Sequence, residues 1–181
     1  SLFSKLFRRL VKPLPFERRE KIIAEITPLS SPGFDFYLLV ILSCSIATMG
    51  LITNSPAVII GAILVEQLMS PIIGRGLASI TGNGQLLENA VSALLRGVIL
   101  AVLLSALVTL VNSHLPIVSL QSLPEEVMAR TRPTPIDLAI ALAGGVAAAY
   151  ALTNPNLSAA LPGVAIATAL MPPLCTVGIG L

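Results

Sequence analysis

From Phe36 to Val65 the chain contains no Asp, Glu, Lys, Arg or His, and similar apolar segments follow as far as Leu181. Of its 181 residues, 55% are hydrophobic and 11% are charged, and the mean hydropathy is +0.91. Soluble domains carry about 25% charged residues, so this chain has too few of them to cover a water-facing surface. We therefore predict an all-α integral membrane protein.

Five apolar segments have about the 17–25 residues that a membrane-spanning helix needs. They cover residues 36–52, 57–80, 89–111, 136–152 and 157–181. The turn Thr53–Pro56 and the polar loop Thr81–Gln85 separate the first three segments. The longest connection, His114–Pro135, contains a predicted short helix with Pro124 in its first turn. Because the sequence ends inside the fifth segment, we expect a sixth span that it does not include, and we assign 33–181 to the membrane domain.

The basic residues are concentrated at the N-terminus, where seven of the eleven Lys and Arg residues precede residue 22. These seven are Lys5, Arg8, Arg9, Lys12, Arg18, Arg19 and Lys21. Basic residues beside a first span indicate its cytoplasmic side, so residues 1–32 are predicted to be cytoplasmic amphipathic helices and a linker. The helix predicted before Pro13 either lies in the membrane surface or packs on the protein itself. This distribution does not resemble a nucleic-acid-binding face, so no nucleic acid partner is expected.

An internal repeat relates the second segment to the fifth. The stretches Asn54–Gly76 and Asn156–Gly178 align without gaps at an offset of 102 residues. The shared positions include Asn54 and Asn156, Gly61 and Gly163, Met69 and Met171, Pro71 and Pro173, and Gly76 and Gly178. Three spans separate the copies, so they would cross the membrane in opposite directions. We predict two inverted three-helix repeats, about 36–113 and 134–181, the second of them incomplete.

Both copies of the repeat contain proline within an apolar segment. Proline removes a backbone donor and clashes with the preceding turn, so the second helix of each repeat is predicted to be broken. A single proline would suit an ordinary kink, whereas recurrence in both copies favours a break that binds a small solute or ion. The candidate binding residues are Asn54, Glu66, Ser70, Pro71, Thr168, Pro172 and Pro173.

Glu66 lies midway along the second segment, where an ionised and unpaired carboxylate would cost at least ~2.5 kcal/mol. It is therefore expected either to be protonated or to have a partner. Arg75 would lie on the opposite face of a continuous helix, towards the cytoplasmic end, so a direct pair is not expected. Two roles stay open for Glu66, namely ion or proton handling and a protonated acid bonded to a neighbouring backbone carbonyl.

Several other residues have structural explanations. Asp137 suits the first turn of the fourth helix, where the helix dipole favours an acid, and His114 lies at the end of the third. Cys44 and Cys175 lie in apolar runs and are interpreted as small core residues. Small residues form a predicted helix-packing face, either internal or between subunits of a homo-oligomer. These residues are Ala141, Gly145 and Ala149.

No recognised pattern of catalytic chemistry is present in the sequence. It has no glycine-rich phosphate loop, no His or Cys spacing typical of a metal site, and no nucleophile elbow. We therefore expect no enzyme, no metal and no cofactor.

The same motifs resemble a bacterial and archaeal multi-pass membrane family catalogued as domain of unknown function 389. The resemblance covers roughly Phe34 to Leu181 and depends on "ATMGLITNSPAVIIGAILVEQLMSPIIG", "TRPTPIDLAIALAGG" and "LPGVAIATALMPPLCTVGIGL". It implies an integral protein of the cytoplasmic (inner) membrane and carries no established activity. The family pattern ordinarily has Ala-Pro where this chain has Glu66 and Gln67, so the acid is a departure from it.

The sequence thus favours a transporter or channel-like protein in contact with the lipid bilayer and an unknown small solute or ion. The alternative is a non-transporting membrane scaffold or sensor subunit.

Overall fold

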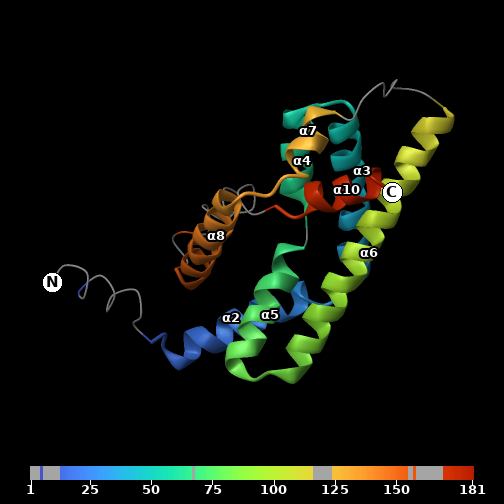
Figure 1. Cartoon of the computed structure of the whole chain (residues 1–181). Helices are drawn as coiled ribbons and strands as arrows, with labels where there is room; N and C mark the ends of the chain where they lie inside the picture. Colours follow the sequence, from blue (N-terminus) through green and yellow to red (C-terminus); the bar gives the residue numbers. More distant parts are fainter. Residues whose placement is uncertain (1–4, 6–12, 67, 116–123, 155–156, 158–168) are drawn as a thin grey trace.

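The computed structural model describes residues 5, 13–66, 68–115, 124–154, 157 and 169–181. These residues form helices and their connections, with no β-strand among them, which confirms the all-helical fold class for the described part. The helices in Figure 1 are α2 (Phe16–Leu29), α3 (Phe34–Ile52), α4 (Pro56–Val65), α5 (Met69–Thr81), α6 (Gly84–His114), α7 (Glu125–Ala129), α8 (Pro135–Thr153) and α10 (Met171–Ile179).

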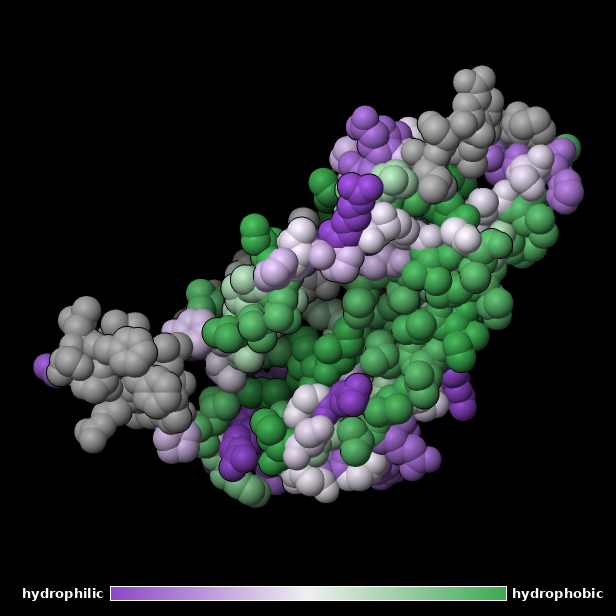
Figure 2. Space-filling view, viewed as in Figure 1, coloured by the Kyte–Doolittle hydropathy of each residue, from purple (hydrophilic) through white to green (hydrophobic). Residues whose placement is uncertain are grey.

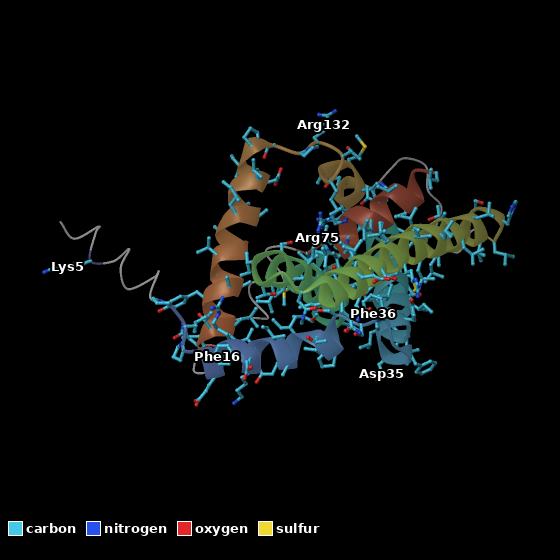
Figure 3. The ribbon with its side chains drawn as sticks, turned by 90° about the horizontal axis from the view of Figure 1, so that it is seen from below. Lys5, Phe16, Asp35, Phe36, Arg75 and Arg132 are labelled. Atoms are coloured by element: carbon cyan, nitrogen blue, oxygen red, sulfur yellow. The ribbon has the colours of Figure 1, made fainter. Side chains whose placement is uncertain are left out.

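The long helix α6 supports most of the other helices. Helices α3, α5 and α10 pack against it, and α4 packs against α3. The short helix α7 lies beside α4 and contacts α3, and α2 packs beneath α5 (Figure 1). Helix α8 stands at the side of the molecule and meets α2 near Phe16 (Figure 3). The described chain is therefore a bundle around α6 with α8 at its margin.

Helix α6 has small buried residues on one face and large exposed residues on the other. The buried residues include Ala90, Ala93, Gly97, Ala101 and Ser105. The exposed residues, each more than half exposed, are Leu95, Ile99, Leu103, Leu107 and Leu110. A soluble helix has the reverse arrangement, and small residues allow close helix packing in membranes. The hydrophobic outer surface along α6, seen in Figure 2, is thus suited to lipid.

Three helices, α3, α6 and α8, are long and apolar enough to cross a membrane, and the bent α4–α5 pair passes the same test as one broken span. They correspond to the first, third, fourth and second predicted segments. Most of the fifth segment lies outside the described residues, and α10 is the helix described within it. The fifth span and the inverted symmetry therefore stay predictions. The helix predicted before Pro13 also lies outside the described residues, apart from Lys5.

A chain of buried polar groups ties α3, α6 and α10 together. The Thr48 hydroxyl donates to the Ser105 hydroxyl oxygen at 3.0 Å, and the Ser105 hydroxyl donates to the Cys175 carbonyl at 2.8 Å. The Cys44 thiol donates to the Ala101 carbonyl at 3.1 Å, and the two sulfur atoms are 3.4 Å apart. All of these side chains are fully buried, which confirms that both cysteines are core residues. In a bundle of mostly apolar contacts, these bonds fix the register of three helices.

Two predictions about helix ends are confirmed, and a third is corrected. His114 is the last residue of α6. The short helix α7 is present, but Pro124 is the residue before its first turn and not within it. Asp137 lies in the first turn of α8, where its carboxylate accepts hydrogen bonds from the Thr134 N–H and hydroxyl groups. This capping box satisfies backbone donors at the start of the helix.

We expect Ser105→Ala to destabilise the bundle, because it leaves the Thr48 hydroxyl without its acceptor and the Cys175 carbonyl without its donor. The expected loss is about 0.6–1.7 kcal/mol, the range for interhelical hydrogen bonds in membrane proteins. Reversible unfolding of the detergent-solubilised protein measures this loss. Ser113→Ala is the matched control, because that exposed hydroxyl donates within α6 to the Leu110 carbonyl. Equal stabilities of the two variants would contradict the proposed role of the polar chain.

Candidate functional site

The second apolar segment is broken between α4 and α5. Helix α4 ends at Val65, and Glu66 follows with an extended backbone (φ −63°, ψ 132°). Helix α5 begins at Met69, and its axis is bent by 48° from that of α4. The chain therefore changes direction at Glu66, which the sequence analysis identifies as a candidate binding residue.

In the second copy of the repeat, a helix begins at the position that corresponds to the start of α5. Helix α10 begins at Met171, which is 102 residues after Met69. The residues that precede the two helices, Leu68 and Leu170, both have a right-handed helical backbone. The local geometry thus agrees with the sequence alignment of the two copies.

The prolines lie just after the breaks, within the first turn of the following helix. Pro71 is the third residue of α5, and Pro172 and Pro173 are the second and third residues of α10. The first-turn N–H groups of a helix have no acceptor inside it, so proline loses no hydrogen bond there. Its ring would instead collide with a helical turn placed before it. The break predicted in the second segment is present, and Pro71 lies just after it in the first turn of α5. The residues before position 169 lie outside the described part of the chain, so the break predicted in the fifth segment stays a prediction.

Glu66 joins the break between α4 and α5 to the start of α10. Its Oε2 atom accepts a hydrogen bond from the Met171 N–H at 3.2 Å, although the two residues are 105 positions apart in the chain. The Leu170 N–H also interacts with this carboxylate. The first break of the chain is therefore in direct contact with the start of α10.

This contact satisfies the N-terminus of α10. Pro172 and Pro173 have no N–H, and the Leu174 N–H donates to the Leu170 carbonyl, so the Met171 N–H needs an acceptor. A carboxylate is favourable at the positive end of a helix. Of the two states expected for Glu66, the structure shows the one with a partner. That partner is a backbone N–H, and neither Arg75 nor a backbone carbonyl.

Asn54 and Ser70 have structural roles. Asn54 adopts a left-handed backbone (φ 54°) before α4, and its Oδ1 atom accepts a hydrogen bond from the Glu126 N–H at 3.0 Å. Ten helical residues, roughly 15 Å, separate it from Glu66, so it does not join the break. The Ser70 carbonyl accepts a hydrogen bond from the Ser30 hydroxyl at 3.2 Å.

The remaining candidates are differently placed. Pro71 and Pro172 are fully buried, and Thr168 lies outside the described residues. The predicted packing residues Ala141, Gly145 and Ala149 are exposed on α8. The small residues that α8 does bury are Gly144, Ala148 and Ala151. The internal form of the predicted packing face is therefore absent from the described structure, whereas a contact between subunits stays a prediction.

Sequence reasoning missed the role of Ser30. It was assigned to a linker, yet it caps α2 and is fully buried against α5. A Cβ atom at Gly74 would collide with the Ser30 side chain, so this glycine makes the close approach possible. Ser30 lies in the sequence Ser-Ser-Pro-Gly, which gives no signal for such a contact.

A cavity of about 640 Å³, here called the outer cavity, lies between α4, α7, α8 and the start of α10. Its lining is mainly apolar but includes Glu126, Arg130 and Asp137. Leu170 and Pro173 also line it, and they flank the Met171 N–H that binds Glu66. The cavity therefore reaches the region where the breaks meet, with charged side chains along its wall.

The comparisons with known proteins identify a family but no activity. A family model described as a domain of unknown function (DUF389) matches residues 63–181. The chain belongs to the DUF389 family. It is also 28% identical over 163 residues to the uncharacterized protein MJ0678 of Methanocaldococcus jannaschii, an alignment that covers 90% of this chain and 48% of that protein. The chain thus spans about half the length of this curated relative. No solved structure matches the chain.

We expect Glu66→Ala to destabilise this DUF389 domain, because the Met171 N–H would lose its acceptor. The expected cost is about 1–3 kcal/mol, as for a buried donor left unsatisfied. Glu66→Gln should cost less, because its amide oxygen can still accept the bond. Unfolding in detergent measures the stability of both Glu66 variants. The control is Glu88→Ala, which removes an exposed acid from α6. An alanine variant as stable as the wild type would show that the contact does not hold α10.

Proposed function

We propose that this DUF389 protein is a transporter or channel-like protein for a small solute or ion in the cytoplasmic membrane. The observation that supports this most directly is the Glu66–Met171 hydrogen bond, which joins the break between α4 and α5 to the start of α10, a distant part of the chain. Secondary transporters commonly bind their substrates where broken helices of two repeats meet. We further propose that the N-terminus lies in the cytoplasm, because the basic residues cluster there.

The chemistry of the contact suits reversible binding. The Glu66 carboxylate is a ligand for a cation, a proton or a solute that donates hydrogen bonds. When it is released from α10, the Met171 N–H becomes a donor at a helix N-terminus, where anionic groups are favoured. One site can thus exchange a bond within the protein for bonds to a solute.

The outer cavity supplies a route to this site. The Arg130 guanidinium forms an ion pair with Glu126 at 3.2 Å, while its Nε atom is buried and has no hydrogen-bond partner among the described residues. Both side chains line the cavity. This ion pair on the wall would offer polar contacts to a solute on its way to Leu170.

Flux through the reconstituted chain tests this proposal. Proteoliposomes are assayed for proton, sodium and potassium flux and for swelling in small neutral solutes, over a range of pH. We expect flux above that of protein-free vesicles. Glu66→Gln should change it about tenfold, as for the loss of roughly 1.5 kcal/mol from a charge-assisted hydrogen bond.

Glu88→Gln is the matched control, because it neutralises an exposed acid on α6 away from the breaks. Identical pH profiles for wild type and Glu66→Gln would remove Glu66 from the mechanism. Absence of flux with every probe would count against transport itself.

The exposed small-residue face of α8 favours a second function. Ala141, Gly145 and Ala149 are exposed on a helix whose neighbours cover little of it, and they line cavities beside this helix. Small residues at this spacing suit close contact between membrane helices, so a homo-oligomeric scaffold or sensor subunit is the alternative. Light scattering on the purified protein distinguishes the two proposals. An oligomer that Ala141→Trp dissociates, in a protein without flux, would favour the scaffold.

A further inference from the structure

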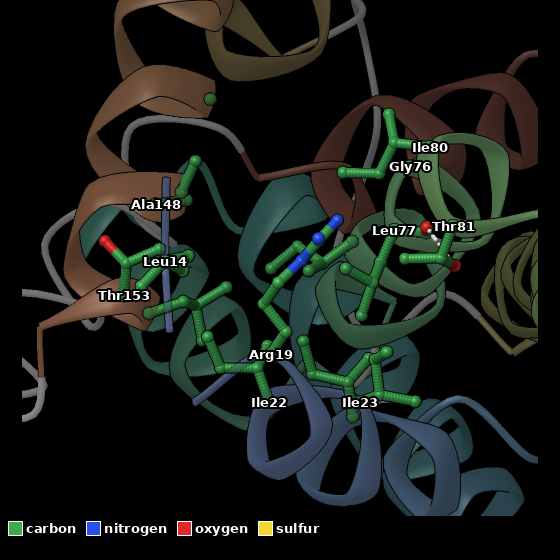
Figure 4. Close-up of a pocket in the computed structure, with 15 residues that line it drawn as sticks. Leu14, Arg19, Ile22, Ile23, Gly76, Leu77, Ile80, Thr81, Ala148 and Thr153 are labelled. Carbon is green, nitrogen blue, oxygen red and sulfur yellow. Dashed lines mark hydrogen bonds between the residues drawn. The ribbon is translucent and has the colours of Figure 1, made fainter. Parts of the chain in front are cut away.

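A second cavity, of about 370 Å³, lies between α2, α5 and α8 (Figure 4). Its walls are almost entirely apolar and include Ile22 and Ile26 of α2, Ile73 and Leu77 of α5, and Leu152 of α8. The volume falls within the roughly 300–1,000 Å³ typical of ligand pockets. Figure 2 shows a hollow with hydrophobic residues between α8 and the rest of the molecule. None of these residues belongs to the break region.

The cavity lies where the predicted cytoplasmic ends of three helices converge. With the N-terminus inside, α5 and α8 both run towards the cytoplasm and end at Thr81 and Thr153. Thr81 and Thr153 both line the cavity, together with residues of the cytoplasmic helix α2. The cavity therefore lies at the level of the inner membrane surface, where acyl chains meet their headgroups.

Arg19 is the one charged residue among the described residues that line this cavity. Its side chain extends from α2 into the space between α5 and α8 (Figure 4), and it remains exposed to solvent. The described residues form one ion pair, Arg130 with Glu126, so no carboxylate of theirs neutralises Arg19. Arg18 is next to it and donates to the Leu152 carbonyl at 3.5 Å. An apolar pocket with a cation at its mouth matches an amphiphile with an anionic head.

We propose that this cavity binds an anionic phospholipid, with an acyl chain among the isoleucines and its phosphate at Arg19. A wholly soluble anion would leave the apolar walls empty, and an uncharged lipid would leave Arg19 without its counterion. A phospholipid satisfies both features, because its chain enters from the bilayer while the phosphate stays at the surface. Bound in this way, it would connect α8 to α2 and α5, which otherwise touch α8 little. The proposal depends on the membrane location of the chain and not on transport.

Native mass spectrometry of the detergent-purified chain tests this inference. The protein is titrated with phosphatidylglycerol, with diacylglycerol of the same acyl chains, which has no phosphate, and with glycerol phosphate, which has no tail. We expect phosphatidylglycerol to bind more tightly than diacylglycerol, and glycerol phosphate not to bind. Arg19→Gln should weaken the binding of phosphatidylglycerol about fivefold, the effect of one basic residue near an anionic surface, and leave the binding of diacylglycerol unchanged.

Filling the cavity gives an independent test. Gly76 lines it, and a Cβ atom there meets no atom within 4 Å, so Gly76→Leu places a side chain in the space without a backbone collision. This variant should weaken both lipids. Gly61→Leu is its control, since Gly61 is equally open but lies on α4. Ala149→Leu fills the cavity from α8 should Gly76→Leu fail to fold.

Lys21→Gln is the control for charge, because Lys21 is exposed on α2 outside the cavity. Equal affinities of the wild type for both lipids would overturn the proposal, as would an equal loss with Lys21→Gln and Arg19→Gln. Folded cavity-filling variants that bind like the wild type would also overturn it. None of these outcomes depends on whether the protein transports a solute.

Discussion

The close approach of helices to the small-residue face of α6 determines the rest of the bundle. A Cβ atom on Gly97 of α6 would lie 2.6 Å from the Leu68 side chain and 3.2 Å from Phe36. Where α10 packs on α6, a Cβ atom on Gly178 of α10 would lie 2.6 Å from the Val102 carbonyl oxygen of α6. Packing at this distance gains dispersion energy, the main source of helix association in lipid, where apolar burial gives little advantage.

The candidate site is a consequence of that packing. Leu68 lies in the break between α4 and α5 and is fully buried, and α10 begins at Met171. Helices α5 and α10 both pack on α6. The C-terminal end of α4 and the N-terminal end of α10 therefore come within hydrogen-bond distance of one another. The Glu66 carboxylate then meets the Met171 N–H without any long polar network. Close apolar packing thus brings two polar helix ends together inside a mostly apolar domain.

Much of the fold could be predicted from local sequence signals. Apolar length predicts α3, α6 and α8, and proline in the second segment predicts the break between α4 and α5. The partner of Glu66 could not be predicted, because it is a backbone group of a residue 105 positions away and leaves no trace in side-chain types. The burial of Ser30 was equally hidden, since it depends on the missing side chain of Gly74. The recurrence of Asn54 in the repeat did not predict its contact, because its side chain accepts a hydrogen bond from the distant Glu126 N–H beside the turn before α4.

The prolines determine where the helices begin, whereas a different residue, Glu66, supplies the polar group that lies between them. Pro71 and Pro173 fix where α5 and α10 begin, whatever residue stands at position 66. A chain with alanine at position 66 would keep the start of both helices while leaving the Met171 N–H without this acceptor. Glu66 is in this sense a tethered substitute for a ligand.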